Sequence, residues 1–221
     1  MVSDMNQQDN RGTSAPKLGL NLPNKLTVTR IFLVPVCMFF VLFEGLPETW
    51  SRIIAAAVFI LTALTDTLDG MIARRLHLVT DFGKFLDPVA DKMLVIGVLL
   101  SMLVRFRADA VFVNIMVWVV FIVFLRELGV TSLRMIVSGK ANIVVAANWM
   151  GKVKTVSQMV CILTILLEPV LIHQFLDSGM LLSYVTAAFM TVMTVASGVQ
   201  YFRAYWQYIR PEKQKGSLPG L

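Results

Sequence analysis

Four aspartates in two pairs are the residues best suited to chemistry in this sequence. Asp66 and Asp69 are three residues apart, and Asp87 and Asp91 are four residues apart. On a helix, either spacing puts both carboxylates of a pair on one face, with Cβ atoms about 5–6 Å apart. Two helices that presented such pairs to each other would form a nest of four carboxylates. Because clustered carboxylates repel one another, the nest needs cations, and oxygen ligands favour hard divalent ions such as Mg²⁺, Mn²⁺ or Ca²⁺.

Small and basic residues accompany the acid pairs. Gly70 and Gly83 have no side chain, so a ligand or a neighbouring backbone can approach closely. Arg74, one turn after Gly70, supplies a fixed positive charge suited to a phosphate. His77 lies between the pairs, and we favour a solvated loop histidine over a metal ligand there. From the residues alone, a cation-transport path or a helix N-terminal acid cluster stays open beside a catalytic site. Acids gathered at one membrane face favour catalysis.

The composition indicates an integral membrane protein with one domain of several helices. Of its 221 residues, 57% are hydrophobic and 15% are charged, with a mean hydropathy of +0.72. A soluble domain would carry about 25% charged residues. The net charge of +6 does not indicate nucleic-acid binding, because an apolar helical bundle offers no long basic groove. Cys37 and Cys161 lie inside apolar segments, where we expect core packing and no disulfide.

The apolar segments predict an all-α membrane protein with six transmembrane helices. The expected spans are about 26–46, 53–75, 85–104, 110–132, 153–174 and 180–203. A short N-terminal amphipathic interfacial helix should precede the first span. Its Arg30 either snorkels to lipid headgroups or serves the substrate. The predicted division is a mobile cytoplasmic tail over 1–20, a six-helix domain over 21–208 and a basic and polar tail over 209–221.

The second and third spans are joined by only about ten residues, so they should be antiparallel. Both acid pairs then lie at one membrane depth on one side. Most of the 20 Lys and Arg residues fall on that side, and three are expected on the other: Arg52, Arg105 and Arg107. The positive-inside rule therefore puts both termini and the acids at the cytoplasmic face of a membrane, for which a bacterial plasma membrane fits. Four aromatic residues should form a belt at this interface: Trp149, Tyr201, Tyr205 and Trp206.

A second polar group interrupts the fourth span. Arg126 and Glu127 are costly inside a membrane unless they face the bundle interior and are paired. Arg134, eight residues after Arg126, lies on roughly the same helical face two turns later. With Lys152 and Lys154, they predict a basic pocket beside the acids, suited to a small phosphorylated acceptor. Contact with anionic lipid headgroups is the alternative for the lysines, and we favour the pocket for Arg126 and Lys152.

These two groups of residues carry a resemblance to a known family. The pattern Asp66-x2-Asp69-Gly70-x2-Ala73-Arg74-x8-Gly83-x3-Asp87-x3-Asp91 resembles the signature of the CDP-alcohol phosphatidyltransferases. A looser pattern, Arg126-Glu127-x4-Ser132-x-Arg134 followed by Gly151-Lys152-x-Lys154-Thr155-x2-Gln158, is similar to that of the phosphatidylglycerophosphate synthases within this family.

The resemblance implies transfer of the phosphatidyl group from CDP-diacylglycerol to sn-glycerol 3-phosphate, with release of CMP, in phospholipid biosynthesis. It implies one or two Mg²⁺ or Mn²⁺ ions held by Asp66, Asp69, Asp87 and Asp91, with Asp91 as the general base. It assigns CDP binding to Asp66, Asp69, Gly70, Ala73, Arg74, Gly83 and Asp87, and acceptor phosphate binding to Arg126, Arg134, Lys152 and Lys154. Family members are commonly homodimers. Phosphatidylinositol phosphate synthase and cardiolipin synthase are the alternatives within the family, and a metal-ion transporter is the alternative outside it.

Overall fold

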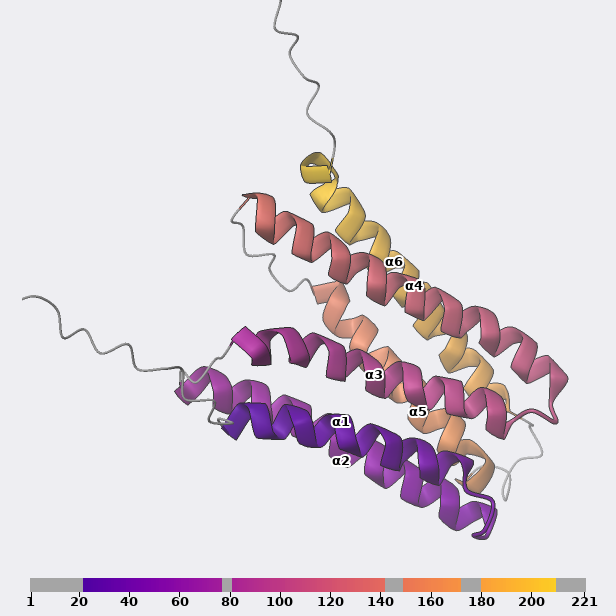
Figure 1. Ribbon diagram of the computed structural model, residues 1–221. Helices are drawn as coiled ribbons and strands as arrows, with labels where there is room; N and C mark the ends of the chain where they lie inside the picture. The colour runs from indigo at the N-terminus through magenta and orange to yellow at the C-terminus, as the bar shows by residue number, and fades with distance from the viewer. Residues whose placement is uncertain (1–21, 77–80, 142–148, 172–179, 210–221) are drawn as a thin grey trace, which may run out of the picture.

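The computed structural model describes residues 22–76, 81–141, 149–171 and 180–209, which form six α-helices and contain no strand (Figure 1). Within them, the side chains of 22–27, 66–76, 81–88, 91, 138–141 and 207–209 are not described. The helices are α1 (Leu22–Leu42), α2 (Glu48–Leu76), α3 (Asp81–Arg105), α4 (Ala110–Ala141), α5 (Trp149–Leu171) and α6 (Leu181–Ile209). The predicted all-α class is therefore confirmed.

The helices are long and apolar because a backbone in lipid must satisfy its own hydrogen bonds. Four of them contain a stretch able to cross a membrane: Glu48–Thr65, Ala110–Val137, Trp149–Leu171 and Leu181–Trp206. A shorter apolar stretch, Val28–Leu42, lies in α1. The chain is thus a multi-pass membrane protein, while the count of six spans stays a prediction. The separate interfacial helix is not confirmed, because α1 runs as one helix from Leu22.

Consecutive helices run in alternating directions through the bundle (Figure 1). Helix α1 packs against α2 and α3, and α6 packs against α4 and α5. The two groups meet where α5 contacts α2 and α3, and where α3 contacts α4. One end of the bundle, which we call the motif end, holds the C-terminal ends of α2, α4 and α6 and the N-terminal ends of α1, α3 and α5. The α1–α2 and α3–α4 connections lie at the opposite end, the far end.

A continuous apolar core runs between the helices. Phe59, Leu99 and Ile162 are among its almost completely buried side chains. Cys37 and Cys161 are fully buried in the same core, which confirms the predicted packing role. Many large apolar side chains on the outside of the helices are exposed, as expected for a bundle whose outer surface meets lipid.

Carboxylates satisfy the N-termini of two helices at the far end. Asp109 Oδ1 accepts a hydrogen bond of 3.0 Å from the amide of Phe112, as an N-cap of α4. Glu168 of α5 accepts hydrogen bonds from the amides of Leu182 and Ser183, at 2.8 and 2.6 Å, and from the Ser183 hydroxyl. A helix leaves its first amides without intrahelical partners, so Glu168 caps α6 from a different helix.

The position of Arg30 in α1 rules out one of its two predicted roles, contact with lipid headgroups. This side chain is completely buried in the bundle, so it faces the interior and does not snorkel to lipid headgroups. The two predicted tails, 1–20 and most of 209–221, lie outside the described residues. The predicted domain division therefore stays a prediction.

Candidate active site at the motif end

The backbone places both halves of the aspartate motif at the motif end. Asp66 and Asp69 lie in the last three turns of α2, and Asp87 and Asp91 lie in the first three turns of α3. Because four residues separate the two helices, the Cα atoms of their ends are at most about 19 Å apart. The side chains of these aspartates are outside the described set, so the carboxylate nest stays a prediction. The same holds for the predicted CDP contacts: Gly70, Ala73, Arg74 and Gly83. His77 lies outside the described residues altogether.

A carboxylate on α4 joins α4 to α5. Glu127 Oε1 accepts hydrogen bonds from Lys154 Nζ of α5 and, at 3.3 Å, from the neighbouring Arg126 Nη1. Glu127 is 7% exposed and Lys154 is 5% exposed. The Arg126–Glu127 pair is therefore turned into the bundle, as its cost in a membrane requires.

One aromatic ring on α6 contacts two arginines of α4. The Cζ atoms of Arg126 and Arg134 lie 5.8 and 5.7 Å from the centre of the Tyr201 ring, within cation–π range. This confirms that the two arginines share one face of α4. We call Arg126, Glu127, Arg134, Lys154 and Tyr201 the basic cluster; it contains three cations and one carboxylate.

Lys92 on the motif helix lies within electrostatic range of the basic cluster. This residue directly follows Asp91 in α3, and its charge interacts with that of Glu127. Helix α3 also packs against both α4 and α5. The basic cluster therefore lies alongside the helix that carries the second acid pair, where its positive charge suits an anionic ligand.

Two buried donors near this cluster have no hydrogen-bond partner among the described residues. They are Arg126 Nε and the amide nitrogen Nε2 of Gln158. Gln158 is 1% exposed and lies one turn after Lys154 on α5. An unsatisfied buried donor costs about 1–3 kcal/mol. A ligand rich in acceptor oxygens, such as a phosphate, would remove this cost.

The predicted acceptor residues divide into two groups. Arg126, Arg134 and Lys154 belong to the basic cluster. Lys152 is exposed, so its assignment as a phosphate ligand stays a prediction. Among the described side chains, no group of three or more His, Cys, Asp or Glu could hold a metal ion. The four motif aspartates are not among those side chains, so the metal assignment is untested.

The predicted place of Tyr201 in the aromatic belt at the membrane interface is wrong, because its side chain is buried in the bundle. Trp149 and Trp206 are 73% and 53% exposed, in agreement with an aromatic belt, whereas Tyr201 is 6% exposed. The signal that identifies it is helical spacing. Thr194 and Ser197 are completely buried, and Tyr201 follows them by seven and four residues on the same face of α6.

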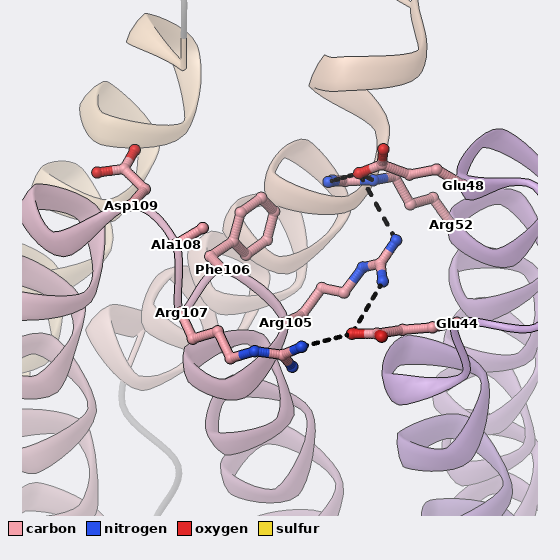
Figure 2. Close-up of a pocket in the computed structure, with 8 residues that line it drawn as sticks. All are labelled: Glu44, Glu48, Arg52, Arg105, Phe106, Arg107, Ala108 and Asp109. Atoms are coloured by element: carbon pink, nitrogen blue, oxygen red, sulfur yellow. Dashed lines mark hydrogen bonds and ion pairs between the residues drawn. The ribbon is translucent and has the colours of Figure 1, made fainter.

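The far end carries a second polar group, which sequence analysis did not identify (Figure 2). A cavity of about 380 Å³ is lined there by Glu44, Glu48, Arg52, Arg105, Phe106, Arg107, Ala108 and Asp109. Arg52 Nη2 lies 2.6 Å from Glu48 Oε1, and Arg105 Nη2 lies 3.6 Å from the same oxygen. Glu44 Oε1 lies 3.1 Å from Arg107 Nη2 and 3.9 Å from Arg105 Nη1. We call Glu44, Glu48, Arg52, Arg105 and Arg107 the ion-pair network.

Arg52 is the buried centre of this network. It is 6% exposed, its Nη1 donates to the backbone oxygen of Ile165 at 3.5 Å, and its Cζ lies 4.7 Å from the centre of the Phe106 ring. These contacts join α2, α5 and the segment after α3. Because each arginine of the network meets a carboxylate of the same network, its arrangement indicates a structural role.

Comparisons with known proteins agree with the motif. A sequence model of the CDP-alcohol phosphatidyltransferases matches residues 20–200. A protein of Bacillus subtilis (strain 168) is 37% identical over 204 residues, which cover 86% of this chain and 97% of the relative. A protein of Escherichia coli (strain K12) is 38% identical over 186 residues, which cover 83% and 94%. Both are named CDP-diacylglycerol–glycerol-3-phosphate 3-phosphatidyltransferase. This chain therefore belongs to the CDP-alcohol phosphatidyltransferase family.

Proposed function

We propose that the protein transfers the phosphatidyl group of CDP-diacylglycerol to sn-glycerol 3-phosphate, giving phosphatidylglycerophosphate and CMP. The names of both relatives support this acceptor. The observation that carries the proposal is the basic cluster on α4, α5 and α6, next to the motif helix α3, which packs against α4 and α5. An acceptor that carries a phosphate needs cations next to the acids that activate it, and an uncharged acceptor does not.

The basic cluster would bind the phosphate of the acceptor. Arg126 and Arg134 bring planar guanidinium groups, which form charge-assisted and bidentate hydrogen bonds with phosphate oxygens. Lys154 adds a third cation, held in place by Glu127. The Nε2 of Gln158, which has no hydrogen-bond partner among the described residues, would donate to a further phosphate oxygen, and Lys152 would guide the anion from the exposed side of α5.

The aspartate motif would bind the pyrophosphate of the donor. Carboxylate oxygens are the ligands that Mg²⁺ and Mn²⁺ prefer, and Asp66 and Asp69 of α2 with Asp87 and Asp91 of α3 would hold one or two such ions. When bound, the metal supplies positive charge that stabilises the attacked phosphate and the departing CMP. Gly70 and Gly83 would let the nucleotide approach the backbone, with Ala73 beside it and Arg74 contributing a further positive charge.

The reaction itself is one substitution at phosphorus. Asp91 would take the proton of the acceptor hydroxyl as that oxygen forms a bond to the phosphatidyl phosphorus. The bond from this phosphorus to the bridging oxygen breaks, and CMP leaves with the electron pair. The basic cluster on α4, α5 and α6 would hold the acceptor beside α3, the helix that carries Asp91.

The assignment is tested with purified protein in detergent, CDP-diacylglycerol and Mg²⁺ or Mn²⁺, with CMP release as the readout. Glycerol 3-phosphate, inositol 1-phosphate, phosphatidylglycerol and serine serve as acceptors, and chelation of the metal is the control. We expect release only with glycerol 3-phosphate and only with metal. Release with inositol 1-phosphate or phosphatidylglycerol would instead assign a phosphatidylinositol phosphate or cardiolipin synthase. No release with any acceptor would overturn the proposal and favour a transporter.

We also propose that the protein is a homodimer in the bacterial plasma membrane, with both termini and the motif end in the cytoplasm. The excess of basic residues around the motif supports this orientation. Single cysteines in place of Lys152 and Arg107, both exposed, test it in a Cys37→Ala/Cys161→Ala background. A membrane-impermeant thiol reagent should label Arg107→Cys and not Lys152→Cys in intact cells. Labelling of Lys152→Cys and not of Arg107→Cys would show that the motif end faces the outside of the cell. Light scattering of the detergent-solubilised protein gives the oligomeric state.

A further inference from the structure

Tyr201 of α6 lies where three helices meet, and its side chain is buried between them. Val130, Leu133 and Val137 of α4 form a buried cluster with it. The Tyr205 ring stacks on it at 6.3 Å between ring centres, with 18° between the planes. On the side of α5, a Cβ added at Gly151 would lie 3.5 Å from the Tyr201 hydroxyl. The ring is therefore packed against neighbours on α4, α5 and α6.

Both arginines of the basic cluster contact this one ring. Their Cζ atoms lie within 6 Å of its centre, although the two residues are about two turns apart on α4. An arginine side chain carries about 2 kcal/mol of rotamer entropy, which is lost when the side chain is fixed. If the ligand has to fix the side chain, this loss weakens binding; if the protein has already fixed it, binding is stronger. The electron-rich ring face also offsets the repulsion between the two cations. Contact with Tyr201 thus holds both arginine side chains in place before a ligand binds.

Helix α6 makes room for Arg126 one turn earlier. A Cβ added at Gly198 would lie 3.3 Å from Arg126 Cγ, which is closer than ordinary van der Waals contact. A side chain at this position would require the aliphatic part of Arg126 to move by a few tenths of an ångström. Arg126 Nε is buried beside this contact and has no hydrogen-bond partner among the described residues.

We infer that Tyr201 is a positioning residue that holds Arg126 and Arg134 as a pair for the phosphate of the acceptor. This inference rests on the proposed function and deepens it. It makes a ring on α6, with Gly198 beside it, responsible for the preference for a phosphorylated acceptor. Tyr201 touches the arginines and not the reacting atoms, so it should affect acceptor binding and leave the chemical step alone.

The test compares Tyr201→Leu with Tyr201→Phe in the full-length protein in detergent. Tyr201→Leu should raise the KM for glycerol 3-phosphate about 10-fold, as expected from the loss of two cation–π contacts. The KM for CDP-diacylglycerol and the kcat should change less than twofold. The inhibition constant of inorganic phosphate, used as a competitive inhibitor against glycerol 3-phosphate, should rise by the same factor. Tyr201→Phe keeps the ring and should restore both constants to near the wild-type values.

Tyr184→Leu is the matched control, because Tyr184 also lies on α6 but contacts Phe112 at the far end. It should lower the melting temperature without changing the KM for glycerol 3-phosphate. An unchanged KM in Tyr201→Leu, with an active wild type, overturns the inference and leaves the proposed function in place. A wild type inactive with glycerol 3-phosphate overturns the proposed function itself.

If Tyr201→Leu does not fold, Gly198→Ala tests the same arrangement from the other side. Its methyl group would lie 3.3 Å from Arg126 Cγ, so the arginine side chain would have to move by a few tenths of an ångström, which should disturb its contact with the Tyr201 ring. We expect a KM for glycerol 3-phosphate raised at least threefold, with the constant for CDP-diacylglycerol unchanged. A KM equal to that of the wild type would then overturn the inference.

Discussion

The two ends of the bundle hold polar groups of similar size but different charge balance. At the far end, three arginines and two glutamates form the ion-pair network, and Asp109 caps α4 beside it. At the motif end, the basic cluster has three cations and one carboxylate, with Lys92 as a fourth cation in electrostatic reach. Both groups join several helices, and both contain an arginine against an aromatic ring.

This difference separates structural from functional charge. A buried charge needs a partner, and the network supplies partners from its own residues. Every arginine of the network lies within 4 Å of one of its glutamates, whereas the described part of the basic cluster has three cations around one carboxylate. Two buried donors beside that cluster, Arg126 Nε and Gln158 Nε2, lack acceptors among the described residues. Substitutions in the network should therefore change stability, and those at the motif end should change activity.

The largest effect is expected for Asp91→Asn. Loss of a general base lowers the rate about 10²- to 10⁴-fold, so turnover should fall at least about 100-fold. The melting temperature in detergent should be unchanged, because the amide has nearly the same shape. CMP release at saturating substrates measures the effect. Near-normal turnover would remove Asp91 as the base.

Asp109→Asn at the far end is the matched control. Asparagine is as good an N-cap as aspartate, so the hydrogen bond to Phe112 should persist. Turnover should equal that of the wild type. A large loss of turnover in this variant would contradict the view that charged residues of the far end serve stability and those of the motif end serve activity.

Arg126→Gln should have the next largest effect. It removes a charged hydrogen bond to the acceptor phosphate, worth about 1.5–3 kcal/mol, so the KM for glycerol 3-phosphate should rise about 10- to 100-fold. The KM for CDP-diacylglycerol should stay the same. Arg105→Gln, which loses two ion pairs of the network, is the control and should leave both constants unchanged. Equal effects of the two variants would move the acceptor site elsewhere.

Arg52→Gln should show the opposite pattern. The change removes a buried guanidinium with contacts to Glu48, Ile165 and Phe106. We expect the melting temperature to fall by several degrees while both KM values stay within twofold of the wild type. Thermal unfolding in detergent and CMP release measure the two quantities on one preparation. A normal melting temperature would show that the network contributes little to stability.

The smallest effect is expected for Arg107→Gln. Arg107 and Glu44 are 66% and 57% exposed, and exposed ion pairs contribute about 0–1 kcal/mol. The melting temperature should fall by about one degree or less at low salt, and the difference should vanish at high salt because the pair is screened. A fall as large as that of Arg52→Gln would show that burial does not set the ranking within the network.

Sequence alone predicted the parts that depend on local pattern. The helix bounds agree with the apolar segments to within a few residues at most ends, although α4 continues to Ala141 instead of ending near residue 132. The pairing of Arg126 and Glu127 inside the bundle followed from the cost of charge in a membrane. The shared face of Arg126 and Arg134 followed from helical spacing.

Contacts between distant segments were not predictable in the same way. The Arg52–Phe106 and Arg105–Glu48 contacts depend on which helices become neighbours at the far end. Tyr201 near a span end fits an aromatic belt equally well in sequence, and only the packing of α6 against α4 turns it inward. Lys152 and Lys154 are two residues apart, so the rotation of α5 decides which one is buried.

The carboxylate of Glu168 also has a consequence for how the membrane domain assembles. Its bonds to the amides of Leu182 and Ser183 fix α5 and α6 at one relative height. A slip of one helical turn, about 5.4 Å, would leave those amides and the carboxylate without partners in lipid. The contact therefore fixes the register of the last two helices independently of their packing against the other four.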